Sequence, residues 1–150
     1  MTEREDTARR IKDLCKAQKL AVLCTQSDNQ PYASLMAFFV SPDLKRLYLI
    51  TPKDTRKFQN LAANPRVAVL VTSSENKSSD FKLAMAATGI GNATEVSGPG
   101  RRRLIDRYLE KHPHLEEFAT SPSSALIEVA VETYVLVEKF QQVSELHLKA

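Results

Sequence analysis

The sequence is poor in the residues and runs that define several common protein classes. Its 150 residues include only two cysteines and no tryptophan, and no apolar run approaches the roughly 18 residues that span a bilayer. Cys15 and Cys24 lack the spacing of a metal site and indicate no disulfide framework, which is typical of a reducing compartment. Met1 is followed by the polar stretch TEREDTARRIKD, so no signal peptide is predicted. We therefore expect a cytoplasmic protein without a membrane segment.

The chain also lacks a strong charge of either sign. Its 21 basic residues are interspersed with 18 acidic ones, giving a formal net charge of +3. Binding of single-stranded nucleic acid requires a basic stripe with interleaved aromatic residues, and neither is visible here. The run Arg101–Arg103 is more simply explained by an Arg102–Asp106 pair and a solvated helix face. We expect no nucleic-acid partner, and one domain spanning residues 1–150.

Hydrophobic periodicity predicts a mainly β protein. Thr2 and Glu5 form a capping box ahead of an amphipathic helix over residues 2–18. Alternating or β-branched segments predict strands at 19–26, 31–40, 46–51, 66–73, 81–96 and 125–140, the last as one bent strand or a hairpin. Further helices are expected at 54–63, at 98–112 and after Pro113. About six strands with short connections indicate a closed or nearly closed antiparallel barrel, not a doubly wound parallel sheet.

The segment ITPKDTRKFQNL, residues 50–61, carries cations at an unusual place. Asp54 or Thr55 is a plausible N-cap, which puts Arg56 and Lys57 in the first helical turn. The positive end of the helix dipole disfavours cations there, and unpaired N–H groups at the same end attract an anion. Hydroxyls, amides and a guanidinium together match a phosphate monoester. The alternative is that both cations simply point into solvent.

Several motifs in this part of the chain resemble the pyridoxamine 5′-phosphate oxidase-like family of FMN-binding split barrels. They are NQPYASLMAFF, LIT at 49–51, TRK at 55–57 and NPRVAVL at 64–70, in the family's order and spacing. The resemblance covers residues 19–72 most sharply, and it implies a split antiparallel barrel with Greek-key topology. It also implies a homodimer with FMN at the subunit interface.

The resemblance implies which residues hold the cofactor. Thr51, Thr55, Arg56 and Lys57 would bind the FMN phosphate, and Ser34 to Ala37 would line the isoalloxazine ring, mostly through main-chain groups. The alternative for the second segment is a plain core strand. The complete set of expected cofactor-binding residues is Ser34, Leu35, Met36, Ala37, Ile50, Thr51, Thr55, Arg56 and Lys57.

The sequence departs from the family where the true oxidase binds its substrate. Phe39 stands at the position of a lysine that contacts the substrate phosphate, and no Arg-x-His pattern surrounds His147. Each lost charge-assisted bond is worth roughly 1.5–3 kcal/mol, so oxidation of a phosphorylated B6 vitamer is not expected. His112 and His114 flank a proline, which predicts a polar turn and no metal site. No catalytic residue can be assigned.

Three possibilities remain open on this basis. The first is an FMN-dependent oxidoreductase that exchanges electrons with a small molecule, because the flavin itself carries the redox chemistry. The second is a non-catalytic flavin-binding or electron-transfer module. Relatives that bind haem or the deazaflavin F420 on the same fold are a third alternative. In a homodimer, the polar loop 74–80 with Phe81 and Lys82 is a candidate to reach the partner's flavin.

Overall fold

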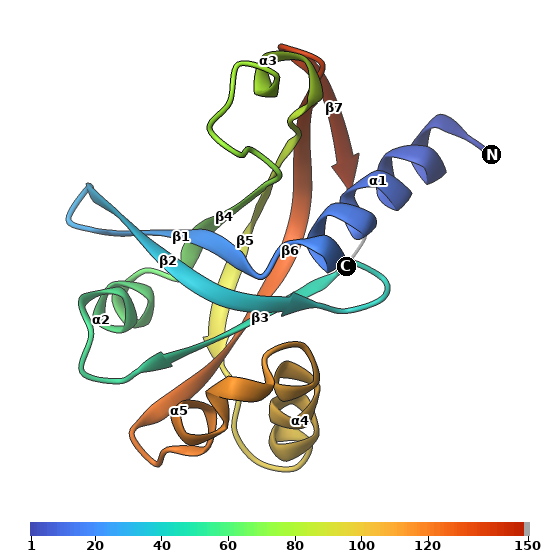
Figure 1. The fold of residues 1–150 in the computed structure, drawn as a ribbon. Coiled ribbons are helices and arrows are strands. Elements are labelled where there is room, and N and C mark those ends of the chain that lie inside the picture. Colours follow the sequence, from blue (N-terminus) through green and yellow to red (C-terminus); the bar gives the residue numbers. More distant parts are fainter. Residues whose placement is uncertain (149–150) are drawn as a thin grey trace.

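A computed structural model describes residues 1–148 and shows a six-stranded antiparallel barrel with flanking helices (Figure 1). Within these residues the strands are β1 (Leu20–Ser27), β2 (Gln30–Val40), β3 (Arg46–Pro52), β4 (Arg66–Thr72), β5 (Ala86–Glu95), β6 (Ser124–Glu138) and β7 (Gln142–His147). The helices are α1 (Glu3–Ala17), α2 (Arg56–Ala63), α3 (Asp80–Leu83), α4 (Arg101–Lys111), the 3₁₀ turn η1 (Pro113–Leu115) and α5 (Glu116–Thr120).

The strand order confirms the predicted barrel and its Greek-key topology. The order is β3-β2-β1-β4-β5-β6-β7, and β3 also pairs with β6, which closes the first six strands into a ring. Strands β1 to β3 follow one another by short turns, and β4 returns to lie beside β1, as a Greek key requires. β7 adds to the free side of β6, outside the ring.

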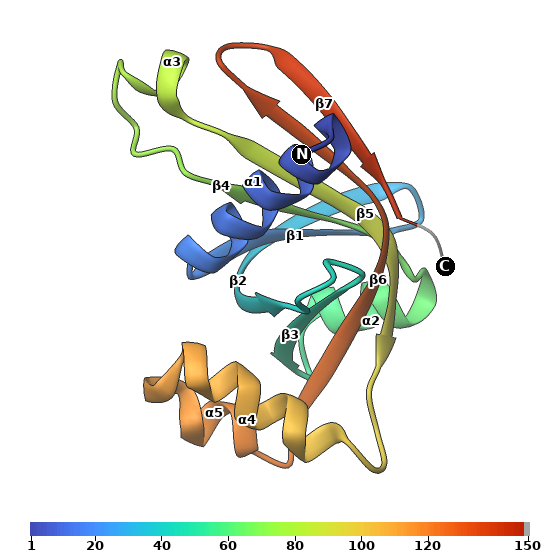
Figure 2. The ribbon, with the colours of Figure 1, turned by 90° about the vertical axis from the view of Figure 1, so that its right-hand side faces the viewer.

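The interior of the barrel is apolar and is completed by two helices. Inward-facing residues such as Leu23, Phe38 and Val129 are almost completely buried. α1 and α2 lie on opposite sides of the barrel (Figures 1 and 2), and each adds apolar side chains to the same core, Ile11 from α1 and Leu61 from α2. Such burial typically contributes about 1.5–3 kcal/mol per large side chain, so α1 and α2 are parts of the folded core.

A second apolar cluster fixes α4 and α5 against the outside of the barrel. Phe39, Tyr48 and Leu126 point outward from β2, β3 and β6 and pack against Ile105 and Tyr108 of α4. The rings of Phe39 and Tyr48 are stacked with their centroids 4.8 Å apart. The outer face of β3 is therefore covered by helices (Figure 2).

A bulge interrupts the pairing of β5 with β6. The pairing of β5 with β6 shifts register between Ile90 and Gly91. A Cβ atom on Gly91 would lie 1.9 Å from the carbonyl oxygen of Ala130, so only glycine allows the two backbones to approach this closely.

One predicted strand was wrong in extent, and one strand was missed. The long strand expected at 81–96 begins only at Ala86, because the preceding residues form helix α3. The Asp80 carboxylate accepts hydrogen bonds from the N–H groups of Glu75 and Lys77, which bends the loop into this helical turn. Residues 125–140 contain one strand, and its hairpin partner β7 comes from a segment to which no strand was assigned.

Candidate anion-binding site at the start of helix α2

A network of hydroxyl groups fixes the turn between β3 and α2. Thr55 is the N-cap, and its Oγ1 accepts a hydrogen bond from the N–H of Phe58 at 3.3 Å. The hydroxyl oxygens of Thr51 and Thr55 are 3.1 Å apart, and they lie 3.2 Å and 2.9 Å from the carbonyl oxygen of Pro52. Thr51 is completely buried, and Ile50, on the opposite face of β3, is buried in the cluster under α4. Thr51 therefore orders the turn that presents the start of α2.

The first turn of α2 has unused hydrogen-bond donors and unpaired positive charge. Within residues 1–148, neither Arg56 nor Lys57 has a carboxylate within ion-pair distance, and neither backbone N–H donates a hydrogen bond. The Arg56 side chain is exposed and its guanidinium lies 5.8 Å from the centroid of the Tyr32 ring. Two N–H groups and two cations at a positive helix end are suited to an anion.

The first turn of α4 is also basic, and it gives a useful comparison. There Arg102 pairs with Asp106 at 3.0 Å, and Arg101 donates to the carbonyl oxygen of Ser124 at 3.3 Å. The Arg102–Asp106 pair confirms the expectation from the sequence. Two of the three arginines in the first turn of α4 are thus paired within the described chain, whereas the cations of α2 are not.

The β2 segment expected to line a ligand alternates between the two faces of the sheet. Met36 is buried with the core, whereas Leu35 is 66% exposed and Ala37 lies beside the cluster under α4. Ser34 shares the inward face with Met36, and its Oγ is buried with no hydrogen-bond partner. Buried polar atoms are rarely left unpaired in proteins, so this hydroxyl fits a position that a bound group would complete.

Strand register places the β2 segment and the α2 turn at the same end of the barrel. Phe38 pairs with Leu49, and continuing that antiparallel register by two residues brings Met36 level with Thr51. A depression of about 400 Å³ lies beside this end, between the β1–β2 turn and α2. Its lining includes Tyr32, Arg56 and Asn60.

Of the residues that line this depression, only Arg56 was predicted from the sequence, and Asn60 and Tyr32 are two that were not. Asn60 is buried and donates to the hydroxyl of Thr25 at 3.1 Å, which ties α2 to β1. No sequence pattern singled out Asn60. Tyr32 could have been found, because strand alternation places it on the same face as Ser34 and Met36.

The two histidines of the KHPHL segment differ from the predicted polar turn. His112 is buried, and its Nε2 lies 2.8 Å from the carbonyl oxygen of Phe38, while His114 is exposed. Burial lowers the pKa of His112, so the ring is held neutral. Among the residues that the structure describes, no group of His, Cys, Asp or Glu could hold a metal ion.

A family model for pyridoxamine 5′-phosphate oxidase matches residues 7–138. The chain belongs to this family. The match extends well beyond the motifs at 19–72 and takes in α4, α5 and β6. A comparison with curated protein sequences finds no match.

Solved structures share the fold of this family member at low sequence identity. A haem-binding protein from Mycobacterium smegmatis has a TM-score of 0.83 at 15% identity over 98% of this chain, which spans 59% of that protein. General Stress Protein 26 from Bacillus anthracis has a TM-score of 0.73 at 20% identity, covering 95% and 98% of the two chains. An FAD-binding protein from Mesorhizobium loti has a TM-score of 0.70 at 18% identity, covering 86% and 90%.

The position that departs from the true oxidase is occupied by a buried aromatic ring. Phe39 is 5% exposed, stacks on Tyr48 and lies 5.6 Å from the guanidinium carbon of Arg107. Its ring contributes to the core between the barrel and α4, where a lysine ammonium would be costly to bury. Residues 74–79 and Phe81 are exposed, and Phe81 packs against Phe140 with ring centroids 5.9 Å apart.

Proposed function

We propose that the protein is an FMN-binding flavoprotein whose phosphate site is the first turn of α2. The observation that carries the proposal is the pair of unpaired cations, Arg56 and Lys57, beside two N–H groups without acceptors in the described chain. The unpartnered hydroxyl of Ser34 at the same end of the barrel adds a polar contact. These groups fit a phosphorylated ligand, and family membership favours a flavin.

Each group has a distinct role in holding FMN. Arg56, Lys57 and their N–H groups would bind the phosphate, with Thr55 holding the helix start in place. The backbone of Ser34 to Ala37 would face the polar edge of the isoalloxazine ring. When bound, the flavin supplies hydride or single-electron transfer, and the chain orients it and limits its contact with water.

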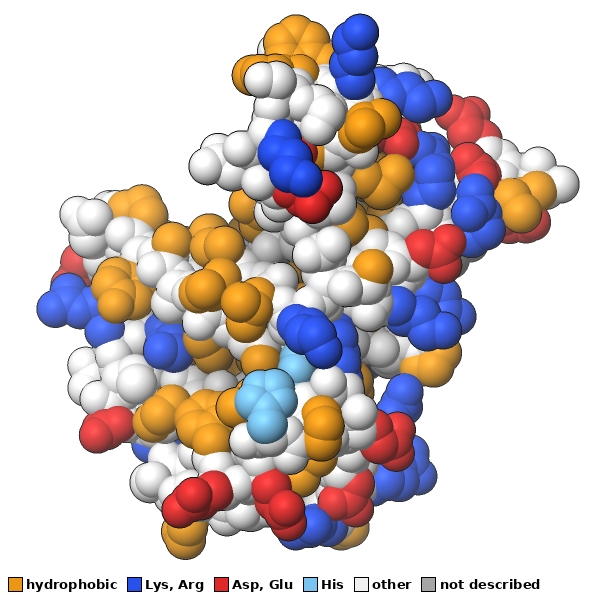
Figure 3. Space-filling model, in the orientation of Figure 1, with side chains coloured by type: hydrophobic (Ala, Val, Ile, Leu, Met, Phe, Trp, Pro, Cys, Tyr) orange, Lys and Arg blue, Asp and Glu red, His pale blue; other side chains and the backbone are white. Residues whose placement is uncertain are grey.

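A solvent-exposed apolar surface supports a homodimer with the flavin at its interface. On the outer face of β1, β2, β4, β5 and β6, apolar side chains are exposed or half-buried where polar residues would be expected. Figure 3 shows hydrophobic side chains gathered over β1 and β2. The members of this outer sheet face are Leu20, Val22, Ala33, Leu35, Ala68, Leu70, Ile90 and Val135.

An oxidoreductase acting on a small molecule is the reaction class that we propose. Hydride transfer to a flavin needs little beyond stacking geometry, which fits the absence of a recognisable acid–base set near Ser34 or Arg56 among the described residues. Oxidation of a phosphorylated B6 vitamer is not proposed, because Phe39 replaces the charged partner of its phosphate. A non-catalytic electron-transfer module uses the same site, and only turnover distinguishes the two.

The absorbance spectrum of the freshly purified protein tests the cofactor. We expect the two flavin bands in the blue and near ultraviolet. A Soret band would instead assign haem, as in the Mycobacterium smegmatis neighbour, and a deazaflavin spectrum would assign F420; either would overturn the FMN proposal. Anaerobic mixing with NADH or NADPH then tests the reaction, since rapid bleaching supports an oxidoreductase and its absence with every donor supports the carrier.

A further inference from the structure

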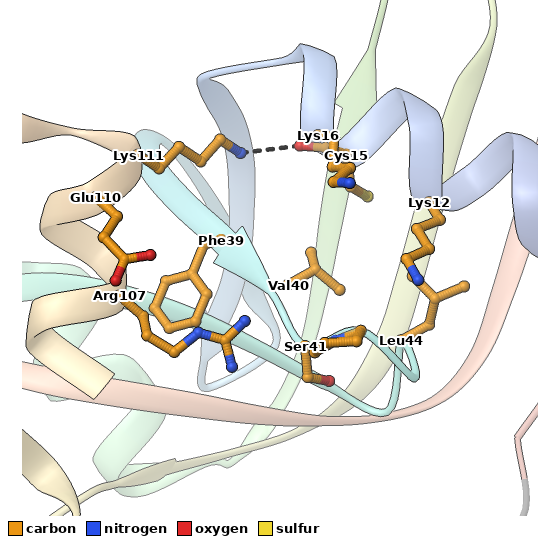
Figure 4. Close-up of a pocket in the computed structure, with 11 residues that line it drawn as sticks. Lys12, Cys15, Lys16, Phe39, Val40, Ser41, Leu44, Arg107, Glu110 and Lys111 are labelled. Atoms are coloured by element: carbon orange, nitrogen blue, oxygen red, sulfur yellow. Dashed lines mark hydrogen bonds between the residues drawn. The ribbon is translucent and has the colours of Figure 1, made fainter. Parts of the chain in front are cut away.

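A groove of about 530 Å³ lies between α1, α4 and the turn that joins β2 to β3 (Figure 4). Its floor is apolar and includes Phe39, Val40 and Leu44. The groove lies on the side of the molecule away from α2 (Figures 1 and 2), so it is separate from the proposed flavin phosphate site. Its volume falls in the range of about 300–1,000 Å³ that holds small organic ligands.

The rim of this groove is positively charged. Lys12 and Lys16 line it from α1, and Arg107 and Lys111 line it from α4. Within residues 1–148, none of these four cations has a carboxylate within ion-pair distance, although other basic residues of the same helices, such as Arg9, Arg10 and Arg102, do. These four cations therefore line the groove without forming an ion pair to any described carboxylate.

Part of this charge is explained by the helices themselves. Lys16 and Lys111 stand in the last turns of α1 and α4, where a cation complements the helix dipole. Lys111 donates to the carbonyl oxygen of Cys15 at 2.8 Å and so caps α1. Lys12 and Arg107 have no such explanation. Glu110 is the one acidic residue that lines the groove, and the C-terminal ends of α1 and α4 each contribute about half a negative charge. Together these offset about half of the charge of the four cations, so the groove keeps a net charge of about +2.

The cations are held against apolar surface, which strengthens their attraction for an anion. The Arg107 guanidinium carbon lies 5.6 Å from the centroid of Phe39, and Figure 4 shows the guanidinium directed over the floor toward Ser41. The Lys111 ammonium lies 3.9 Å from the centroid of Phe38, and burial lowers its pKa to about 8. Charge–charge attraction is larger in such partly desolvated surroundings than in bulk water.

We infer that this groove binds a small organic anion, a carboxylate or phosphate attached to an apolar body. The anionic group would lie between Lys12, Lys16 and Arg107, and the apolar body would cover Val40, Leu44 and the edge of Phe39. Complementary charge selects this occupant over a neutral apolar molecule, and the apolar floor selects it over a simple inorganic anion.

Titration of the isotope-labelled full-length protein with phenyl phosphate, followed by backbone amide NMR, tests the inference. We expect saturable shifts at residues 12–16, 40–44 and 107–111. Inorganic phosphate and phenol should each bind at least about tenfold more weakly at these amides, because each lacks one half of the recognised chemistry. Shifts confined to residues 55–58, or equal affinity for phenyl phosphate and inorganic phosphate, would overturn the proposal.

Matched variants separate the groove from general surface charge. Arg107→Ala should weaken phenyl phosphate binding at least about fivefold, whereas Arg103→Ala, an exposed residue of the same helix outside the groove, should change it less than twofold. Lys12→Glu with Lys16→Glu reverses charge at two exposed positions of α1 and keeps the test valid if Arg107→Ala fails to fold. Unchanged affinity in that double variant would contradict the proposal.

Discussion

The His112 imidazole is a neutral, buried hydrogen-bond donor that links α4 to β2. Its Nε2 donates to the Phe38 carbonyl oxygen at 2.8 Å, and its ring lies beside Tyr108 with centroids 5.0 Å apart. Burial lowers its pKa, followed by smaller effects that include the positive charges of Lys111 and Lys19. The unfolded chain therefore binds a proton at His112 more readily than the folded protein does.

The stability of the protein should consequently fall as pH drops below the ordinary histidine pKa of about 6.5. The stabilisation is fully present above that pH and is lost as pH falls toward the lowered pKa of the folded state. Urea unfolding of the wild type at a series of pH values from neutral to mildly acidic measures this loss. His112→Gln should show a smaller decrease, and His114→Gln, at an exposed position, should follow the wild type. Parallel curves for wild type and His112→Gln would refute the assignment.

At the residue scale, local spacing predicted contacts within one helix but not contacts between elements. The Arg102–Asp106 pair follows from i,i+4 geometry alone and was predicted. The burial of His112 was not predicted, because it depends on α4 docking against the outer side of β2. Lys111, Pro113 and His114 are polar or turn-forming residues, so the sequence around His112 predicted a polar turn.

At the scale of single elements, the start of α2 depends on its cap. The Thr55 hydroxyl accepts from Phe58 N–H and lies in the network with Thr51 and the Pro52 carbonyl. Thr55→Ala should therefore destabilise the protein by about 1–2 kcal/mol, the upper part of the usual range for a lost N-cap, because the buried Thr51 hydroxyl loses a neighbour too. Urea denaturation measures the change. Thr55→Ser keeps the hydroxyl and should remain within about 0.5 kcal/mol of wild type; an equal loss in both variants would show that the hydroxyl is not the cause.

The sequence predicted most elements because their signals are local. Alternating apolar residues bounded by turns mark β1 to β4, and caps and apolar stripes mark α1, α2 and α4. The turn between β6 and β7 has no such signal, since Lys139, Phe140 and Gln141 all adopt positive φ without a glycine. Only the pairing of β7 with β6 explains that conformation. α3 was missed because its defining contact, Asp80 to Glu75, lies inside a polar loop.

At the scale of the whole molecule, the outer sheet face should mediate dimerisation. Leu35 and Leu70 flank Val22 on this face, because each pairs with Val22 from a strand that neighbours β1. Leu35→Glu with Leu70→Glu places two charges in the proposed interface, where burying an unpaired charge is costly. Sedimentation velocity should show a dimer for the wild type and a monomer for this double variant. Ala17→Glu, at an exposed position of α1, is the control and should remain dimeric; a monomeric wild type would exclude the proposed assembly.

Fold and family could both be predicted because the motifs at 29–39, 49–51, 55–57 and 64–70 hold their spacing. The structure brings the first three of these motifs together at one end of the barrel, through the register of β2 with β3 and the turn into α2. The outer sheet face and the groove beside Arg107 could not be predicted, since each combines residues from elements far apart in sequence.

None of the helices described within residues 1–148 combines the length and the apolar composition that a membrane-spanning helix needs.

The most direct test of the account is the affinity for FMN after Arg56→Ala with Lys57→Ala, measured by titration calorimetry of the cofactor-free protein. If each cation makes one charge-assisted bond to the phosphate, the double variant should bind FMN at least about 3 kcal/mol more weakly, or about 150-fold. Arg102→Ala with Arg103→Ala removes two cations from the first turn of α4 and should leave the affinity within a factor of about two. An unchanged affinity for FMN in the Arg56→Ala and Lys57→Ala double variant would contradict the assignment of the phosphate site to the start of α2.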